Sequence, residues 1–266
     1  MKDWIIVRGG GDLATGTIYK LWKSGFYVLI LECEQPSAIR RRVAFSDAIY
    51  RGVQKVEDLE CHLVHSFREA KECAVDGYVP ILIDPQGSVI EECRPRAVVD
   101  AILAKKNLGT HRDMAARTIA LGPGFEAGVD VDYVIETKRG HNLGRIIEKG
   151  MASPNTGIPG VIGGYGKERV IHGPAKGIFH EICQIGDVLE KGQVIGWIDA
   201  QGTKVEVKAS IEGILRGIIR DGYPVTKGFK IADIDPRKEE RKNCDTISDK
   251  ARCIAGGVLE AVLREK

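Results

Sequence analysis

The chain has 266 residues, 43% of them hydrophobic, and a formal net charge of +2 at pH 7. This length accommodates one large domain or two modest ones, and the apolar content is sufficient for a packed core. The near-neutral charge gives no electrostatic reason to expect nucleic acid as a partner. Because no apolar run resembles a membrane span or a signal peptide, we expect a cytoplasmic protein.

A glycine-rich turn follows the first apolar segment. Residues 4–8 read as a buried strand, and residues 13–24 carry apolar side chains at helical spacing. Gly9 and Gly11 lie between these segments, and Ala14 lies in the second. The three residues occupy the key positions of the G-x-G-x-x-A form of the dinucleotide fingerprint. The pattern predicts a strand, a tight turn and a helix whose N-terminus faces a ligand.

Asp12 makes this turn unusual, because it follows Gly11 where a pyrophosphate would meet the helix N-terminus. A carboxylate there repels an anion, and it can itself cap the free N–H groups. It can instead accept hydrogen bonds from the amino and ring N–H groups of a pterin or purine. We therefore expect Gly9, Gly10, Gly11 and Asp12 to form a modified nucleotide site, with a ligand-free helix cap as the alternative for Asp12.

The segment 27–31 reads as a second, parallel strand, and Glu32 closes it where dinucleotide folds keep a ribose-binding acid. Further strands are expected at 61–64, 79–83, 97–102 and 118–121, with a helix near 66–76. The alternation of strands and helices predicts an α/β domain over residues 1–150, with a mainly parallel, Rossmann-like sheet.

Two further groups of residues lie near predicted strand ends. Arg40 and Arg41, in a run of three arginines, follow the second strand, where NADP-type enzymes keep a cation for phosphate. A solvated surface is the alternative for such a charge run. Gly122 and Gly124 follow the strand at 118–121, and glycine-rich strand ends either present N–H groups to anions or simply turn.

A glycine-bounded loop holds Arg139, His141 and Asn142. Mixed hydrogen-bond donors in a loop are typical of binding or catalysis. We include all three in the candidate cofactor site.

The second half of the chain contains an internal repeat. A Gly- and Pro-rich stretch at 153–160 marks a boundary, and beyond it residues recur after 36 positions without a gap. The matches are Gly177 with Gly213, Gly186 with Gly222, Lys191-Gly192 with Lys227-Gly228, Ile195 with Ile231, and Ile198-Asp199 with Ile234-Asp235. Two such β units are each too small to bury their own faces, so we expect them to pair into one core.

The turn at 185–195 resembles that of biotinyl/lipoyl-type barrel-sandwich domains, which predicts such a domain over residues 151–237. In those carrier domains a modified lysine lies on the hairpin between the halves. Here Gly202 takes that position, so we expect an unmodified docking or scaffolding barrel. Residues 238–266 are expected to form a charged linker and then a helix, 249–265, capped by Thr246 or Ser248 and packed back onto the protein.

Several motifs occur in one order along nearly the whole chain. They are Arg8–Gly16, Glu34-Gln35-Pro36 with Ile39-Arg40-Arg41, Phe45–Tyr50, Leu121–Phe125, Glu136–Gly144, Pro154-Asn155-Thr156-Gly157 and Ile247–Arg252. Together they resemble the accessory proteins of the selenium-dependent molybdenum hydroxylase system, the YqeB-type family, which is related in part to the XdhC maturation factors.

The resemblance implies a role in maturing a molybdenum-containing hydroxylase, through handling of its pterin cofactor or of the terminal chalcogen. On this hypothesis the first domain binds a nucleotide-bearing molybdopterin cofactor, and the partner is the hydroxylase apo-enzyme. The related maturation factors also point to a homodimer, although the oligomeric state is left open.

The seven cysteines are scattered and form no C-x-x-C pair, which argues against a disulfide framework and gives no zinc-ribbon spacing. Cys61, His62 and His65 lie close together, but on a stretch that alternates like a strand, so we expect no metal there. Transfer of a chalcogen would need a reactive thiolate. Cys33 lies nearest the predicted crevice, but its glutamate neighbours raise its pKa. Cys244, beside Lys242 and Asn243, has a more electropositive and exposed setting, and it is the weak catalytic candidate.

Two other functions stay open. An NAD(P)-dependent oxidoreductase is favoured by the glycine fingerprint and Glu32, and opposed by Asp12 and by the lack of an evident pair of groups for hydride chemistry. A non-catalytic adaptor that docks a partner through the barrel is the third hypothesis.

Overall fold

The chain folds into two compact units in the computed structural model, which describes residues 2–154 and 160–264. Within that range the first unit contains residues 2–36, 43–154 and 247–264, and the second contains 37–42 and 160–246. Three segments differ from the expected division, and the first is 151–154, which belongs to the first unit instead of the barrel domain. Residues 37–42 leave the first unit, and residues 238–246 belong to the second unit instead of forming a linker.

Most of the Pro154-Asn155-Thr156-Gly157 motif lies outside the described residues, as does the end of the expected helix at residue 265.

A nine-stranded sheet forms the centre of the first unit, in the order β10-β9-β7-β6-β1-β2-β5-β4-β3. From β9 to β4 all neighbours are parallel, whereas β10 and β3 pair antiparallel at the two edges. The bounds are β1 (Trp4–Arg8), β2 (Tyr27–Glu32), β3 (Val53–Val56), β4 (Leu59–Val64), β5 (Val79–Ile83), β6 (Ala97–Asp100), β7 (Thr118–Leu121), β9 (Tyr133–Ile135) and β10 (Ile146–Ile147). The prediction of a mainly parallel sheet is confirmed, although β3, β9 and β10 had not been expected.

Helices cover both faces of this sheet. Ile5 and Val7 of β1 pack into one cluster with α1 (Asp12–Lys23) and α5 (Asp249–Leu263), and Ile6 packs on the other side with α3 (Phe67–Val75) and α4 (Ile90–Cys93). This alternation follows from the two-residue period of a strand. The unit also contains α2 (Ala48–Arg51), the 3₁₀ turns η2 (Phe45–Asp47) and η3 (Arg112–Met114), and a small sheet of β8 (Glu126–Ala127) with β11 (Gly150–Met151).

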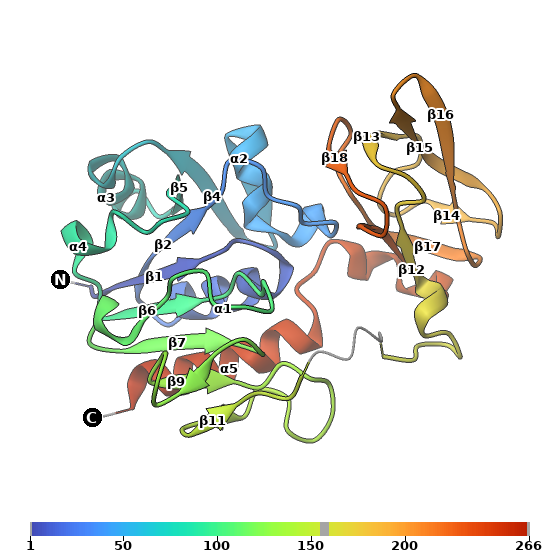
Figure 1. Ribbon diagram of the computed structural model, residues 1–266. Helices are drawn as coiled ribbons and strands as arrows, with labels where there is room; N and C mark the ends of the chain where they lie inside the picture. Colours follow the sequence, from blue (N-terminus) through green and yellow to red (C-terminus); the bar gives the residue numbers. More distant parts are fainter. Residues whose placement is uncertain (1, 155–159, 265–266) are drawn as a thin grey trace. The chain divides into compact units, whose positions relative to one another are not determined.

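The C-terminal helix α5 begins at its predicted cap and lies against α1 (Figure 1). Ser248 is the N-cap, and its Oγ accepts a hydrogen bond of 3.2 Å from the Ala251 backbone N–H. Gly16 allows the close approach, because a Cβ added there would lie 2.7 Å from the Cβ of Ala251. The apolar stripe of α5 is thereby buried. None of the described helices is long and apolar enough to cross a membrane.

The second unit consists of two four-stranded antiparallel sheets, β12-β19-β17-β14 and β16-β15-β13-β18. The strands are β12 (Val170–His172), β13 (Gly177–Glu181), β14 (Val188–Leu189), β15 (Val194–Ala200), β16 (Thr203–Lys208), β17 (Gly213–Ile218), β18 (Pro224–Val225) and β19 (Lys230–Asp235). The 3₁₀ turns η4 (Lys167–Arg169) and η5 (Lys238–Cys244) complete it, while η1 (Arg41–Val43) lies where the chain passes back to the first unit.

The internal repeat corresponds strand for strand to this architecture. β13, β14 and β15 of the first half match β17, β18 and β19 of the second, and the short middle strand of each half pairs in the sheet of the other. Backbone hydrogen bonds repeat as well: the N–H of Gly186 donates to the Leu215 carbonyl, and that of Gly222 to the Phe179 carbonyl. The two halves share one apolar core, as the repeat predicted.

Candidate functional site

The glycine turn, Gly122 and Gly124 follow the carboxyl ends of parallel strands at one edge of the sheet in the first unit, and Glu32 is the last residue of β2 at the same edge. The chain leaves β1 toward β2 on one side, and β6 is its neighbour on the other, so the strand order reverses at β1. In open α/β sheets, ligands bind beyond the carboxyl ends at such a point. Figure 1 shows β1, β6 and β7 pointing the same way, with both chain termini at the opposite end.

The three glycines of the turn after β1 have different surroundings. Gly9 has a φ of +94°, and a Cβ there would lie 3.0 Å from the Ala101 carbonyl oxygen. A Cβ on Gly10 would lie 2.9 Å from the Ser46 backbone nitrogen. A Cβ on Gly11 would meet nothing within 4 Å. Packing therefore explains why Gly9 and Gly10 have no side chain, but it does not explain Gly11.

Glu32 folds back onto the glycine turn. Its Oε2 accepts a 2.8 Å hydrogen bond from the Gly10 N–H, and its Oε1 accepts one of 2.9 Å from the Cys33 N–H. The carboxylate thus fixes the turn, with lone pairs left for a further donor. Binding of a ribose by Glu32 stays a prediction.

Helix α1 begins with Gly11 as its N-cap, at φ −64° and ψ 179°, and Asp12 is the first helical residue. Asp12 is therefore not the cap, and the alternative that assigned it this role is wrong. The Oγ1 of Thr15 donates to the Gly11 carbonyl at 2.9 Å and accepts from the Phe45 N–H at 3.0 Å. The Ser46 N–H also donates to the Gly10 carbonyl at 2.9 Å. The glycine turn is therefore hydrogen-bonded both to Thr15 of α1 and to Ser46 of η2.

A buried polar network lies beneath this edge. Arg8 is 2% exposed, and it donates to the Thr110 Oγ1 at 2.6 Å and to the Pro85 carbonyl at 2.8 Å. The Thr110 hydroxyl in turn donates to Asp100 at 2.6 Å. Burial raises the pKa of Asp100, against the hydrogen bond from Thr110 and the charge of Arg8. The network ties the end of β1 to that of β6 and to the loop that follows.

Gly122 and Gly124 are required by close packing at the end of β7. Gly122 has a φ of +75°, and its Cβ would lie 2.6 Å from the Thr137 Oγ1. Gly124 has a φ of +110°, and its Cβ would lie 2.9 Å from the backbone of Lys105. These contacts account for both glycines as turn residues, and anion binding by them stays a prediction.

Glu136 organises the loop that follows β9. Its carboxylate accepts hydrogen bonds from the Lys138 N–H at 2.7 Å and the Ser153 N–H at 2.9 Å. Burial alone would raise the pKa of Glu136, but these bonds outweigh it and the pKa is lowered. Beyond it, Arg139 forms two hydrogen bonds with the Asp249 carboxylate, at 2.6 and 3.0 Å. His141 and Asn142 are exposed on the same loop.

Lys250, which was not among the residues predicted from the sequence, lies near the charged groups of this edge. It is half-buried in the first turn of α5, within the electrostatic reach of Arg139, Asp12 and Glu136. Burial lowers the pKa of Lys250, and the charge of Arg139 lowers it further. The Ile247–Arg252 motif contained this lysine, but only the packing of α5 beside α1 places it near the glycine turn.

Arg40 and Arg41 have their observed contacts in the second unit, not at the carboxyl edge where the sequence placed them. Arg40 is 7% exposed and donates to the Asn243 carbonyl at 3.2 Å. Arg41 pairs with both Glu181 oxygens, at 2.8 and 2.9 Å, and donates to the Ile218 carbonyl. These contacts attach residues 37–42 to the second unit. Cofactor binding by the two arginines stays a prediction.

The sequence indicated an exposed setting for Cys244, but the residue is only 3% exposed and lies in the core of the second unit. Burial raises its pKa, with a smaller contribution from Asp245, against the charges of nearby arginines. A buried thiol of raised pKa is a poor nucleophile, so this candidate is corrected. In the first unit, burial and then the charge of Glu32 raise the pKa of Cys33 to about 11.

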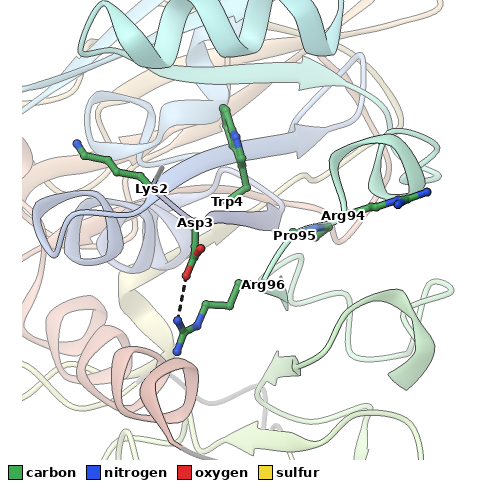
Figure 2. A pocket seen from close by; sticks show the side chains of 6 residues that line it. All are labelled: Lys2, Asp3, Trp4, Arg94, Pro95 and Arg96. Atoms are coloured by element: carbon green, nitrogen blue, oxygen red, sulfur yellow. Dashed lines mark hydrogen bonds and ion pairs between the residues drawn. The ribbon is translucent and has the colours of Figure 1, made fainter.

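Within residues 2–154 and 160–264, no group of three His, Cys, Asp or Glu side chains is placed to hold a metal ion. A pocket of about 340 Å³ lies at the amino ends of β1 and β6, lined by Lys2, Asp3, Trp4, Arg94, Pro95 and Arg96. In Figure 2 the side chains of Asp3 and Arg96 face each other, 2.9 Å apart, and Arg94 points away. This pocket is at the opposite end of the strands from the glycine turn.

The fold and site define an α/β protein with a largely parallel sheet, smaller antiparallel sheets and a C-terminal helix. Its sequence is 48% identical over 259 residues to the uncharacterized protein YqeB of Escherichia coli (strain K12), and the chain is a homologue of that protein. The match covers 97% of this chain and 47% of YqeB, so the chain spans about half the length of its relative. No family model matches the chain.

Three solved structures align with 88% of the chain at a TM-score of 0.28. They are the product-bound ectoine utilization protein EutE (DoeB) from Ruegeria pomeroyi (8% identity, 85% of that chain), an aspartoacylase family protein from Mesorhizobium loti (9%, 85%) and a succinylglutamatedesuccinylase/aspartoacylase from Rhodobacter sphaeroides (12%, 84%). Scores this low carry no inference about fold or activity.

Proposed function

We propose that the first unit is a Rossmann-like domain that binds a molybdopterin-type cofactor or a related nucleotide at the carboxyl edge of its sheet. The protein would then act as an accessory factor in the maturation of a selenium-dependent molybdenum hydroxylase, with the cofactor as cargo and the apo-enzyme as partner. The order of motifs along the sequence supports the hydroxylase system. The second unit, with its paired repeats, is proposed to be a barrel-sandwich of the biotinyl/lipoyl type.

The observation that carries the proposal is the open space beside Gly11. Gly9 and Gly10 have neighbours that exclude a side chain, but a Cβ on Gly11 would meet nothing within 4 Å. A glycine at the start of a helix, with no packing reason to be one, fits a position where backbone N–H groups approach a phosphate.

The surrounding residues fit a ligand with both phosphate and pterin or purine groups. The first turn of α1 offers backbone N–H groups at the positive end of the helix dipole. Asp12, the first residue of α1, supplies a hydrogen-bond acceptor for amino and ring N–H groups. A dinucleotide would present mainly anionic groups here, whereas a pterin or purine ring makes use of the carboxylate.

An NAD(P)-dependent oxidoreductase is the second candidate, favoured by Glu32 at the end of β2. Both Glu32 oxygens, however, already accept backbone hydrogen bonds, at 2.8 and 2.9 Å. The third candidate is a non-catalytic adaptor, a homodimer in which the second unit docks the hydroxylase.

Native mass spectrometry of the full chain, expressed in cells supplied with molybdate and selenite, tests the proposal. A bound mass matching a molybdopterin species is the expected result. A nicotinamide dinucleotide would replace the proposal with the oxidoreductase function. If only the bare polypeptide appears, and capture of a hydroxylase subunit then succeeds without any cofactor, the adaptor function takes its place.

A further inference from the structure

The loop between β6 and η3, residues 101–111, crosses the carboxyl edge of the sheet in the first unit. β6 lies between β1 and β7, and the loop packs against the turn that follows each of these two strands. A Cβ on Gly9, in the turn after β1, would lie 3.0 Å from the Ala101 carbonyl oxygen. A Cβ on Gly124, in the turn after β7, would lie 2.9 Å from the backbone nitrogen of Lys106. The loop therefore lies between the two glycine-containing turns of the candidate site.

Two residues of this loop have a backbone conformation that is costly for any residue with a side chain. Leu103 has a φ of +60° and Lys105 a φ of +64°, in the left-handed region that favours glycine. Leu103 is explained by packing, because its side chain lies against the apolar core of the first unit, next to Gly122. Lys105 is exposed, so packing does not account for a lysine at this position. Strained residues of this kind cluster at functional sites, where the surrounding structure holds them in place.

Hydrogen bonds hold the far end of the loop. Thr110 is 1% exposed, and its hydroxyl accepts a hydrogen bond from Arg8 and donates one to Asp100, both of 2.6 Å. The Oδ1 of Asn107 accepts hydrogen bonds of 2.8 Å from the Gly109 and Thr110 N–H groups. The loop is thus tied to the buried network beneath the sheet edge, which favours a defined position for the exposed residues before it.

Lys105 and Lys106 place two adjacent positive charges on this loop. Both side chains are exposed, and neither forms an ion pair or a side-chain hydrogen bond within residues 2–154 and 160–264. Lysine binds phosphate groups as a compact point charge. A strained lysine that packing does not require, beside a second lysine at the carboxyl ends of parallel strands, fits a position that binds an anionic ligand group.

We propose that Lys105 and Lys106 bind the phosphate group of the ligand at the carboxyl edge of the sheet. The inference rests on the proposed function, in that a ligand binds at this edge. It adds the ligand class, a phosphate or pyrophosphate ester, and the residues that recognise its charge. The anionic group is then bound by the loop after β6, and Asp12 of α1 is left for the amino and ring N–H groups.

Replacement of Lys105 by glycine distinguishes a role in binding from a role in the fold, because it removes both the charge and the side chain that strains the backbone. Lys105→Gly should unfold in urea with a midpoint at or above that of the wild type. Its affinity for inorganic pyrophosphate, measured by calorimetric titration of the full chain, should fall by about 10-fold, the lower end for loss of a charged hydrogen bond. Lys106→Ala should lower the affinity by a similar factor, and Lys105→Arg, which keeps the charge, should retain most of it.

Gln201→Gly is the matched control. Gln201 is also exposed and left-handed, with a φ of +56°, but it lies in the hairpin between β15 and β16 of the second unit. This variant should keep or gain stability in the same way and bind pyrophosphate like the wild type.

Unchanged affinity in Lys105→Gly or Lys106→Ala, with the wild type binding, would overturn the role of that lysine and leave the proposed function intact. A clearly lower urea midpoint in Lys105→Gly would show instead that the fold requires this lysine. A wild type that binds no pyrophosphate would overturn the inference. The proposed function fails with it only if native mass spectrometry also finds no bound molybdopterin species.

Discussion

The two units differ in whether steric contacts account for their glycines. In the second unit, a Cβ on Gly177 would collide with the Asp199 carbonyl, and a Cβ on Gly213 would collide with that of Asp235. These contacts are equivalent under the 36-residue repeat, so the fold requires both glycines. In the first unit, Gly11 has no such neighbour. A glycine that packing already explains carries no evidence of function, whereas Gly11, which packing does not explain, also begins a helix at the carboxyl edge of the parallel sheet, where ligands bind.

The largest effect on stability is expected for Arg8, a buried arginine of the first unit. Arg8→Met removes the buried guanidinium, so Thr110 Oγ1 and the Pro85 carbonyl each lose a hydrogen-bond donor, and Asp100 loses the nearby positive charge. We expect a loss of about 3 kcal/mol in the free energy of unfolding, as for breaking a buried polar network. Urea denaturation measures it, with the exposed Arg68→Met as control. A loss below about 1 kcal/mol, the range of exposed pairs, would show that Arg8 is not structural.

The symmetry of the second unit predicts a matched pair of effects. Gly177→Ala and Gly213→Ala each force a methyl group onto a backbone carbonyl, so each should destabilise the protein by roughly 1–3 kcal/mol. Both variants should be destabilised, because the contacts are related by the repeat, and Gly213→Ala should lose more, since its φ of +148° is strained for a residue with a side chain. Thermal or urea unfolding of both variants provides the measurement. A loss in only one of the two variants would contradict the equivalence of the two halves.

The smallest effect concerns Lys250, a half-buried cation in the first turn of α5. Its pKa is lowered from the usual 10.5, so between the folded-state pKa and 10.5 the unfolded chain binds more protons and stability rises with pH. Below that interval the ammonium is penalised in the folded state. Lys250→Met should therefore be slightly more stable than the wild type at pH 7, and the difference should shrink as the pH approaches 10.5.

Unfolding curves of the two proteins between pH 7 and pH 10 would test this sign. A Lys250→Met variant that is less stable than the wild type at pH 7 would contradict this prediction, because it would mean that the ammonium stabilises the fold.

Local patterns were sufficient to predict much of the fold. The strand at β1, the glycine turn and α1 follow from short-range apolar spacing, and the repeat correctly paired the halves of the second unit. The missed strands are short: β3 has four residues, β9 three and β10 two. Segments this short hold too few residues to show a period, and their pairing depends on the sheet already present.

Contacts between distant residues account for the errors in the candidate site. Arg41 follows β2 in the sequence, yet its partner Glu181 lies 140 residues further on. Cys244 lies among charged residues, and its burial depends on the second core forming around it. Lys250 joins Asp12 only because α5 packs on α1. In each case the neighbours along the chain gave no information about the neighbours in space.

The measurement that tests the central claim most directly is native mass spectrometry of wild type, Gly11→Ala and Gly256→Ala, all expressed with molybdate and selenite. A Cβ meets nothing within 4 Å at either glycine, so both variants should fold, with a loss of at most about 1 kcal/mol at the cap position. We predict that wild type and Gly256→Ala carry the same nucleotide-bearing mass and that Gly11→Ala is bare. The same bound mass on Gly11→Ala, or none on any of the three proteins, would contradict the account.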